Sequence, residues 1–375
     1  MHPVTIDGEN LIPGGKSQES TIPLTCKAGV VSNNGPNYKL TIEDVQVPTP
    51  GPNELLIRLN TTGICYSDIH YMLEDLALPR MRDYGVRSPG HEGAGVVVAL
   101  GANVTNWKTG DRAGIKPTWD TCGKCDLCWG DMECHCKGVI PTGLKVPGTY
   151  QQYIISPARY TSPIPDAVDD FSAGPIMCSG STMYRSLKVS ALQPGDFAVF
   201  TGAGGGVGHI GIQLANAMGL RVIGIDTGAE KRALCLALGC EAFIDFSSSV
   251  SVIDEVFALT HGLGAHGVFV TATSSKAYAD APKMCRVGGK VMCVGMPPTG
   301  TAFVGGEPME MILRGLSVVG TLTGSLKDTN STLEFAARGL LKPIVEKCGL
   351  GNLPQAVEKL RARKVGGRIV VNFNA

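Results

Sequence analysis

The sequence predicts an α/β protein in which a doubly wound parallel sheet is joined to a second, β-rich domain. Its 375 residues exceed the size of about 250–300 residues at which a single hydrophobic core stops growing, so two domains are expected. Short β-like runs dominate up to about residue 178, whereas strands alternate with helices from about residue 180 onward. Such alternation requires crossover connections, and these join parallel strands.

The first part of the chain carries the β-rich pattern. Three apolar runs are expected to be strands, namely Leu55–Leu59, Gly95–Leu100 and Tyr150–Ile155. Clusters such as PTPGPNE and KTGDR mark turns between strands. Residues 1–20 are polar and rich in glycine and proline, so we expect a loosely ordered arm there.

The second part repeats a strand–helix unit. The expected strands are Phe197–Thr201, Arg221–Asp226, Glu241–Phe246, Gly267–Thr271, Lys290–Val294 and Ser317–Thr321. The helices expected between them are Val207–Met218, Ala229–Leu238, Val250–Thr260, Lys276–Cys285 and Met309–Arg314. Six such strands are typical of a doubly wound nucleotide-binding domain.

The C-terminal tail departs from this rhythm. It contains two amphipathic segments, Thr329–Leu341 and Leu353–Arg363, followed by an apolar strand, Arg368–Phe373. We interpret the tail as returning to the first domain. The predicted domains are therefore 1–179 with 322–375, which is β-rich, and an inserted nucleotide domain, 180–321.

Composition limits the class of protein. Lys+Arg 33 and Asp+Glu 33 give a formal net charge of zero, which argues against a nucleic-acid or anionic-membrane partner. No apolar run reaches the ~18 residues of a membrane span, and the N-terminus lacks the pattern of a secretory signal. Thirteen cysteines are then expected to be metal ligands and buried thiols in a reducing, cytoplasmic compartment.

The segment CGKCDLCWGDMECHC predicts a metal site. It spaces Cys122, Cys125, Cys128 and Cys136 so that four thiolates can surround one ion, and a site with no open position would be structural. Cys134 is close enough to be an alternative ligand. An iron–sulfur cluster and a loop of free thiols are the other interpretations that the spacing allows.

A second motif follows the first expected strand of the nucleotide domain. GAGGGVG, residues 202–208, contains Ala203, Gly205, Gly206, Val207 and Gly208 just before a helix, where glycines let a backbone approach a pyrophosphate. The functional register is taken as Ala203-x-Gly205-x-x-Gly208.

The next strand ends in an acid. Asp226 follows Gly208 by 18 residues and is placed to accept hydrogen bonds from ribose hydroxyls. Because a carboxylate there would repel a 2′-phosphate, NAD is expected rather than NADP.

Six motifs occur in order between about residue 22 and the C-terminus: GICYSDIH, GHEGAGVV, the four-cysteine loop, GTYQQY, MCSG and GGRIVV. Together they resemble the zinc-dependent medium-chain alcohol dehydrogenases, most closely the yeast and filamentous-fungal type. The resemblance implies a Rossmann NAD-binding domain, a GroES-like catalytic domain and two zinc ions per chain, one catalytic and one structural. It also implies a homotetramer or homodimer assembled through the nucleotide-binding domains.

The resemblance assigns roles to residues around the catalytic zinc. Cys65, His91 and Cys178 match the ligands, with the fourth position left for water or substrate. Glu92 matches a glutamate that can approach the metal, and otherwise it would be a buried carboxylate beside the ligands. Asp68 matches the carboxylate that orients the ligand histidine through its other ring nitrogen.

Further matches concern the proton and the cofactor. Ser67 and His70 match the two side chains of a relay that carries the hydroxylic proton toward solvent. Lys231 matches a lysine that contacts the cofactor ribose, and Arg368 matches an arginine that pairs with the pyrophosphate. Taken alone, each of these four side chains could be an ordinary turn, surface or helix-start residue.

The expected activity is reversible hydride transfer between a primary or secondary alcohol and its carbonyl product. Pro117 stands where the yeast pattern has a tryptophan in the substrate pocket, and Trp119 lies two residues later. A substrate pocket lined by fewer bulky side chains favours, as an alternative, a branched, aromatic or ring-bearing substrate. Polyol dehydrogenases, zinc-free reductases of the same fold and a non-catalytic nucleotide-binding protein remain as weaker alternatives.

Overall fold

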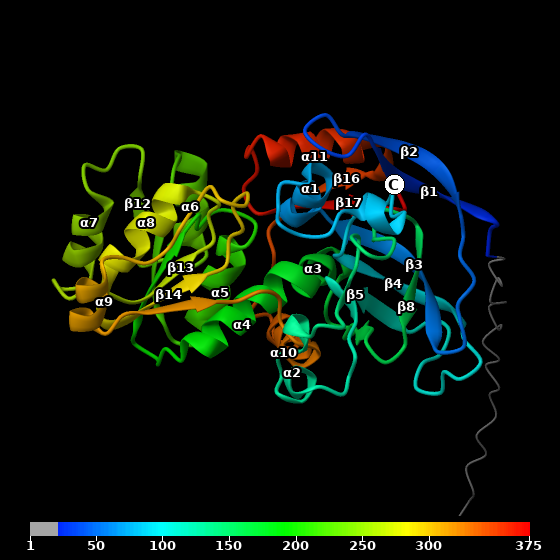
Figure 1. Ribbon diagram of the computed structural model, residues 1–375, viewed down its shortest axis with the longest axis horizontal. Coiled ribbons are helices and arrows are strands. Elements are labelled where there is room, and N and C mark those ends of the chain that lie inside the picture. Colours follow the sequence, from blue (N-terminus) through cyan, green and yellow to red (C-terminus); the bar gives the residue numbers. More distant parts are fainter. Residues whose placement is uncertain (1–21) are drawn as a thin grey trace, which may run out of the picture.

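Two large sheets organise this computed structural model, which describes residues 22–375, and they lie side by side in Figure 1. The arm expected over residues 1–20 lies outside the described residues. The parallel-sheet and β-rich parts that the sequence predicts correspond to these two sheets.

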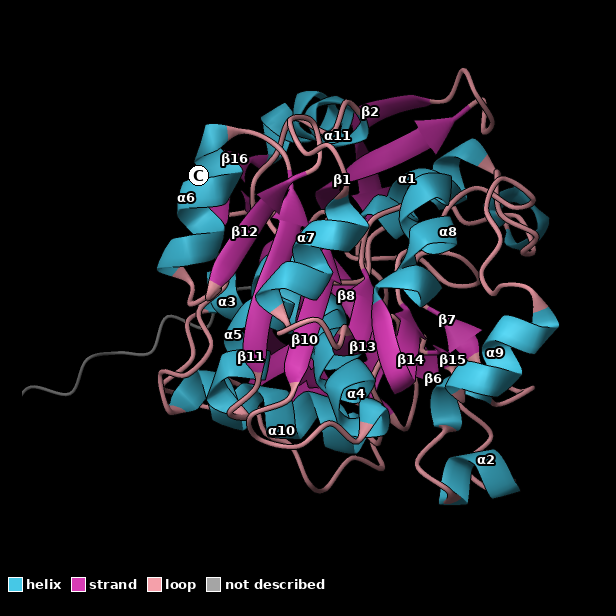
Figure 2. Cartoon of the chain, turned by 90° about the vertical axis from the view of Figure 1, so that its left-hand side faces the viewer, coloured by secondary structure: helices cyan, strands magenta, loops and turns pink. Residues whose placement is uncertain are grey.

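The first sheet has six parallel strands in the order β12-β11-β10-β13-β14-β15, which Figure 2 shows next to one another. Their bounds are β10 Phe197–Thr201, β11 Arg221–Asp226, β12 Ala242–Asp245, β13 Ala265–Val270, β14 Cys285–Cys293 and β15 Ser317–Gly320. The helices are α5 Gly208–Ala217, α6 Ala229–Ala237, α7 Val252–Leu259, α8 Ser275–Met284 and α9 Pro308–Arg314. This order is that of a doubly wound sheet, in which a ligand site is expected beside the carboxyl end of β10.

The alternation of side chains along each strand explains how both faces of this sheet are covered. Ala198 and Phe200 of β10 pack in the same core as Ile210 of α5, whereas Val199 packs in a second core with Val256 of α7. Successive side chains of a strand point to opposite faces, so one apolar strand supplies both cores.

The second sheet has seven strands, in the order β16-β17-β3-β4-β5-β9 with β8 paired to β3. The strands are β3 Glu54–Gly63, β4 Gly93–Leu100, β5 Arg112–Ile115, β8 Tyr153–Pro157, β9 Ser162–Pro163, β16 Val345–Gly349 and β17 Arg368–Asn372. Two small sheets pair β1 Thr25–Ser32 with β2 Lys39–Gln46, and β6 Thr118–Asp120 with β7 Ile140–Pro141. The C-terminal strands thus join the sheet of β3 and β4, after α10 Leu326–Ala337 and together with α11 Leu353–Arg361.

Several helices that the sequence analysis did not predict lie within the β-rich part or directly after it. They are α1 Tyr66–Leu73, α2 Asp126–Trp129, α3 Asp170–Pro175, a π-helical turn Ile176–Gly180 and α4 Ser181–Ser190, with short 3₁₀ turns Met81–Tyr84, Glu133–His135 and Leu350–Asn352. The start of α1 has a local cause: Cys65 is its N-cap and Asp68 closes a capping box on the Cys65 amide. Within residues 22–375, no helix combines the length and apolar character needed to cross a membrane.

Candidate active site

Four side chains with metal-binding atoms converge from three separate segments. The ligand atoms of Cys65, His91, Glu92 and Cys178 all lie within 4.8 Å of one another. Cys65 is the N-cap of α1, His91 and Glu92 precede β4, and Cys178 lies in the π-helical turn before α4. The structure therefore brings together the three predicted ligands and the predicted fourth carboxylate.

Asp68 fixes the orientation of the His91 ring. Its Oδ1 lies 2.7 Å from Nδ1 of His91, while its Oδ2 accepts hydrogen bonds from the Cys65 amide at 3.0 Å and the Tyr150 hydroxyl at 2.9 Å. With Nδ1 turned to Asp68, Nε2 is the ring nitrogen left to face a metal. Asp68 is fully buried, so these contacts are needed to compensate the loss of hydration.

The ligands influence one another's protonation. A hydrogen bond with Cys178, aided by the charge of His91, holds the pKa of Cys65 well below its usual range, and the same bond raises the pKa of Cys178. Burial alone would lower the pKa of His91, but the charges of Asp68 and Cys65 outweigh it and raise that pKa. A metal ion bound here would therefore displace protons from these side chains, because thiolates and neutral imidazoles are the forms that ligate.

Glu92 and Arg368 connect this cluster to the glycine loop. The carboxylate of Glu92 is hydrogen-bonded to the Arg368 guanidinium, and both side chains are buried. Burial raises the pKa of Glu92 to about 7, although the charge of Arg368 opposes that rise. Gly63 is required here because a Cβ at that position would lie 2.0 Å from Oε2 of Glu92. On its other side Arg368 meets Gly206, where a Cβ would lie 2.8 Å from Nη1.

Ser67 and His70 both lie on α1. The Ser67 hydroxyl lies 3.6 Å from the sulfur of Cys65, so it borders the ligand cluster. His70 is buried, with Nδ1 2.6 Å from Oδ1 of Asp75 and Nε2 2.9 Å from the Met296 carbonyl. Both partners are hydrogen-bond acceptors, and together they fix the position of the ring. Asp75 is 27% exposed and therefore connects the buried imidazole to solvent.

The other metal cluster is formed by the four-cysteine loop. Neighbouring sulfur atoms of Cys122, Cys125, Cys128 and Cys136 lie 3.4–3.8 Å apart. Cys134 is buried outside this cluster, where burial raises its pKa to about 11. Of the two cysteines that spacing allowed, the structure places Cys136 in the cluster and Cys134 outside it.

The glycine loop joins β10 to α5 at the carboxyl edge of the parallel sheet. A Cβ at Gly208 would lie 2.3 Å from the Gly202 carbonyl, so only glycine lets the helix start this close to the strand. At Gly205 the nearest atom to a Cβ is 3.1 Å away, which leaves more room.

Asp226 lies at the end of β11 beside this loop. Its Oδ2 accepts a hydrogen bond from the Gly204 amide at 3.0 Å, and its Oδ1 pairs with the Lys231 ammonium at 2.9 Å. The acid and the lysine that the sequence analysis selected are therefore in direct contact, next to the glycine loop.

Similarity to known proteins shows which family this chain belongs to. Residues 206–338 match the zinc-binding dehydrogenase model, and residues 51–166 match the alcohol dehydrogenase GroES-like domain. An alcohol dehydrogenase of Schizosaccharomyces pombe is 39% identical over 355 residues, covering 94% of this chain and 99% of the relative. The chain belongs to the zinc-binding alcohol dehydrogenase family. The relationship that the six motifs predict is confirmed.

Further similarities extend over nearly the whole length of this family member. Alcohol dehydrogenase 1 of Emericella nidulans is 36% identical over 338 residues, covering 89% of this chain and 94% of that protein. A crystal structure of an NAD-dependent alcohol dehydrogenase has a TM-score of 0.81 at 27% identity and covers 92% of this chain and 99% of its own. The predicted fold, a Rossmann domain with a GroES-like domain, is thereby confirmed.

Both cysteine-containing clusters fit the zinc that this dehydrogenase family binds. Four sulfurs at about 2.3 Å from one zinc ion lie about 3.8 Å apart at the corners of a tetrahedron, close to the sulfur separations seen in the four-cysteine loop. The other cluster offers two sulfurs and one imidazole, a donor set with room for a further ligand. Zinc fits the first as a closed site and the second as an open one.

Sequence reasoning missed three contributors to this dehydrogenase site. Asp75 pairs with His70, and its only sequence signal is its position just after the helix that carries His70. Tyr150 lies within the GTYQQY motif, but nothing in that motif reveals its hydrogen bond to Asp68. His209 is fully buried, with Nδ1 2.9 Å from the Gly205 carbonyl and Nε2 3.1 Å from the Ile344 amide, so it links the glycine loop to the C-terminal tail.

Proposed function

We propose that this chain is a zinc- and NAD-dependent alcohol dehydrogenase that reversibly oxidises a primary or secondary alcohol. The observation that carries the proposal is the meeting of Cys65, His91 and Cys178 beside Ser67, with Arg368 linking that cluster to the glycine loop. An open metal position and a nucleotide loop are thereby joined through one buried side chain. That arrangement suits hydride transfer better than it suits nucleotide binding alone.

When bound, zinc supplies a Lewis acid that lowers the pKa of a hydroxyl, and NAD supplies the hydride acceptor. Cys65, His91 and Cys178 hold the ion, and Asp68 keeps the His91 ring in the orientation that ligation needs. Two thiolates and a neutral imidazole balance the charge of Zn²⁺, so the site accommodates both an anionic and a neutral oxygen. Glu92 stays hydrogen-bonded to Arg368 and is near enough to serve as a transient ligand.

The proton leaves through side chains of α1. Ser67 would receive it near the metal cluster, and His70 would deliver it toward solvent through Asp75. The ribose of the bound cofactor would connect the two side chains, as the resemblance to related dehydrogenases implies. The exposed edge of Asp75 supports this direction, because the imidazole itself is buried.

The cofactor is held at the carboxyl edge of the parallel sheet. Ala203, Gly205, Gly206, Val207 and Gly208 form the loop that receives the pyrophosphate, with Arg368 beside it. Asp226 accepts hydrogen bonds from the ribose hydroxyls, and Lys231, which pairs with Asp226, also contacts the ribose. The Asp226 carboxylate would repel a 2′-phosphate, so NAD is selected over NADP. Residues 180–321 form the cofactor domain, and residues 1–179 with 322–375 form the catalytic domain. The pairing of β17 with β3 supports this division.

The proposed assembly is a homodimer or homotetramer formed through the nucleotide domains. Strand β15 is at the edge of its sheet, and apolar side chains of α9 and β15 are exposed beside it, namely Met309, Ile312, Leu313 and Val318. A large exposed apolar patch is typical of an interface. The thirteen cysteines, all among the described residues and none in a disulfide, support the proposed cytoplasmic location.

A bulkier substrate than ethanol is the second candidate. The three tryptophans have other roles: Trp107 and Trp119 donate to the carbonyls of Ala158 and Ile155, and Trp129 is 77% exposed. Pro117 therefore has no indole substitute among these contacts, which favours a roomier pocket. Tyr71 contributes an aromatic ring beside the cluster, with its centroid 6.3 Å from that of His91.

Initial rates of NADH formation with ethanol and with benzyl alcohol test the function and the pocket together. Turnover of either alcohol that requires zinc and NAD supports the proposed activity. A higher kcat/KM for benzyl alcohol favours the roomier pocket, and a higher value for ethanol contradicts it. A protein with two bound zinc ions that oxidises no primary or secondary alcohol in a panel of short, branched and aromatic substrates would overturn the proposal.

A further inference from the structure

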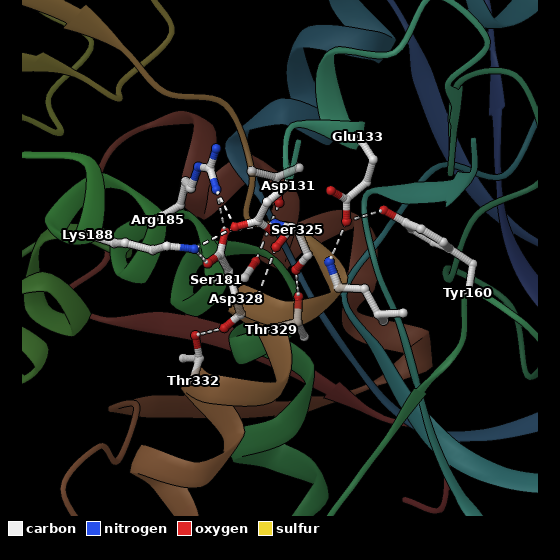
Figure 3. A network of polar contacts seen from close by, with 12 residues as sticks. Asp131, Glu133, Tyr160, Ser181, Arg185, Lys188, Ser325, Asp328, Thr329 and Thr332 are labelled. Carbon is white, nitrogen blue, oxygen red and sulfur yellow. Dashed lines mark hydrogen bonds and ion pairs between the residues drawn. The ribbon is translucent and has the colours of Figure 1, made fainter. Parts of the chain in front are cut away.

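A network of charged side chains connects the four-cysteine loop to α4 and α10 (Figure 3). The loop contributes Asp131 and Glu133, which lie between its third and fourth cysteines. Neither acid is a metal ligand, and the proposed reaction does not use them. Their partners belong to helices that follow the metal ligand Cys178 or begin the C-terminal tail.

Asp131 reaches the side of α4. Its Oδ2 lies 3.1 Å from Nη1 of Arg185 and 2.6 Å from the Lys188 ammonium. Both cations also contact Asp328 of α10, at 3.2 and 2.9 Å, and Asp328 is fully buried. Asp131 has a left-handed backbone with φ 60°, so the shape of the loop at this residue determines whether its carboxylate reaches α4.

Glu133 reaches the start of α10. Its Oε1 accepts hydrogen bonds from the Leu326 amide at 2.7 Å and from the Tyr160 hydroxyl at 3.1 Å. Leu326 is the first residue of α10, where a backbone N–H has no partner within the helix. A loop carboxylate therefore completes the cap that Ser325 and Asp328 begin.

Helix α4 connects this network to the catalytic cluster. The helix begins at Ser181, directly after the turn that holds Cys178, and the Ser181 hydroxyl donates to the carbonyls of Met177 and Cys178. Arg185 is seven residues beyond Cys178, which is about 10 Å along a helix axis. Fixing Arg185 and Lys188 therefore restricts how the Cys178 turn can tilt.

We propose that Asp131 and Glu133 are positioning residues that let the four-cysteine site hold Cys178 in place through α4 and α10. A closed metal site keeps the loop in the shape that presents both carboxylates, and loss of that metal releases them. Coupling of this kind is reciprocal, so weakening the helix contacts also loosens metal in the four-cysteine site. The inference rests on the proposed assignment of the two zinc sites.

Asp131→Asn is the most informative substitution. It removes one of two acids facing Arg185 and Lys188 but leaves Asp328 to pair with them, so no buried charge is left unpaired. Glu133→Ala removes the cap on Leu326, and Glu133→Gln restores an acceptor there. Asp126→Asn is the matched control, because Asp126 is an exposed acid of the same loop beside Cys125.

Two measurements on the full chain report the coupling without relying on activity. The first is the rate at which zinc is released to a chelator. Release from two sites should give two kinetic phases, and the phase that is absent in a Cys136→Ser variant belongs to the four-cysteine site. The second is the visible absorption of cobalt placed in the Cys65–His91–Cys178 site, which responds to ligand geometry. We expect Asp131→Asn and Glu133→Ala to release the four-cysteine metal roughly threefold to tenfold faster and to shift the cobalt spectrum. Asp126→Asn and Glu133→Gln should resemble wild type.

Combining Asp131→Asn with Cys136→Ser separates coupling from simple loss of stability. If the acid acts through the loop, the double variant should have the same cobalt spectrum as Cys136→Ser alone. Equal release rates and spectra for Asp131→Asn, Glu133→Ala and Asp126→Asn would overturn the inference. A wild-type chain that binds fewer than two zinc ions would instead overturn the metal assignment, and the inference with it.

Discussion

His70 illustrates how a residue selected from a motif gains a partner that the motif does not reveal. The sequence predicts it as the end of a proton relay on the way to solvent, yet its ring is buried between Asp75 and the Met296 carbonyl. Asp75 is the partly exposed member of this pair, so the proposed relay would reach water through Asp75 and not directly from His70.

Replacing His70 with glutamine should slow alcohol oxidation at least about tenfold near pH 7, because proton transfer to solvent loses its ring. The loss should shrink at alkaline pH, where hydroxide can accept the proton directly. The pH profile of kcat/KM measures this effect, and Asp75→Asn should produce a smaller change of the same kind. A profile that keeps its shape in His70→Gln would argue against the relay.

Asp226 offers a second test on a single side chain. Asp226→Ser removes the charge expected to repel a 2′-phosphate and frees Lys231 from its ion pair. The ratio of kcat/KM for NADP to that for NAD should rise about tenfold or more, which corresponds to about 1.4 kcal/mol. Asp245, which ends the neighbouring strand β12, provides the control: Asp245→Ser should leave cofactor preference unchanged. The assignment fails if Asp226→Ser still rejects NADP.

Among the secondary-structure elements, β10 and α5, which flank the glycine loop, agree closely with the sequence. The strand Phe197–Thr201 is predicted with its observed bounds, and α5 starts one residue later than predicted. Their proximity explains the glycines, because Gly208 has no room for a side chain against Gly202.

A pair of alanine substitutions tests this packing. Gly208→Ala should cost about 1–3 kcal/mol of folding stability and weaken NAD binding, because the added methyl group forces helix and strand apart. Gly205→Ala, in the same loop, meets its nearest atom at 3.1 Å and should cost less stability. Thermal unfolding measures the change in folding stability, and NAD titration measures the change in cofactor affinity. Equal losses of folding stability in the two variants would contradict the packing explanation.

Other elements were not predictable from local pattern. The segment around Cys178 is apolar and was expected to belong to the β-rich part, but it forms a π-helical turn between α3 and α4. Its side-chain hydrogen bonds, such as Ser179 to the Pro175 carbonyl, satisfy backbone groups that a π turn leaves irregular. A short apolar run has no periodicity that separates such a turn from a strand.

At the scale of the whole molecule, one of the two open edges of the parallel sheet has exposed apolar side chains beside it. Strand β15 has no neighbour on its outer side among residues 22–375, and α9 exposes Ile312 and Leu313 next to it. An edge strand with exposed apolar neighbours is prone to pair with another copy.

Leu313→Asp should therefore shift the proposed homodimer or homotetramer toward monomers, because a charge buried in an apolar interface is unfavourable. Sedimentation velocity would measure the oligomeric state across a range of protein concentrations. Leu263→Asp introduces the same charge at an exposed leucine after α7 and should leave the assembly intact. An unchanged oligomer in Leu313→Asp would place the interface elsewhere.

By itself, the sequence determined the doubly wound sheet and the position of the glycine loop after its first strand, because both depend on local periodicity and on a motif with characteristic spacing. The proposed metal ligands came from the resemblance to known dehydrogenases. The tertiary structure alone decided which side chains face one another: Cys136 rather than Cys134 in the four-cysteine cluster, Asp75 beside His70, and Arg368 between Glu92 and Gly206. The physical reason is that these contacts join residues whose approach depends on how helices and sheets pack. A linear pattern records which groups are present, whereas packing determines the distances that give them their chemistry.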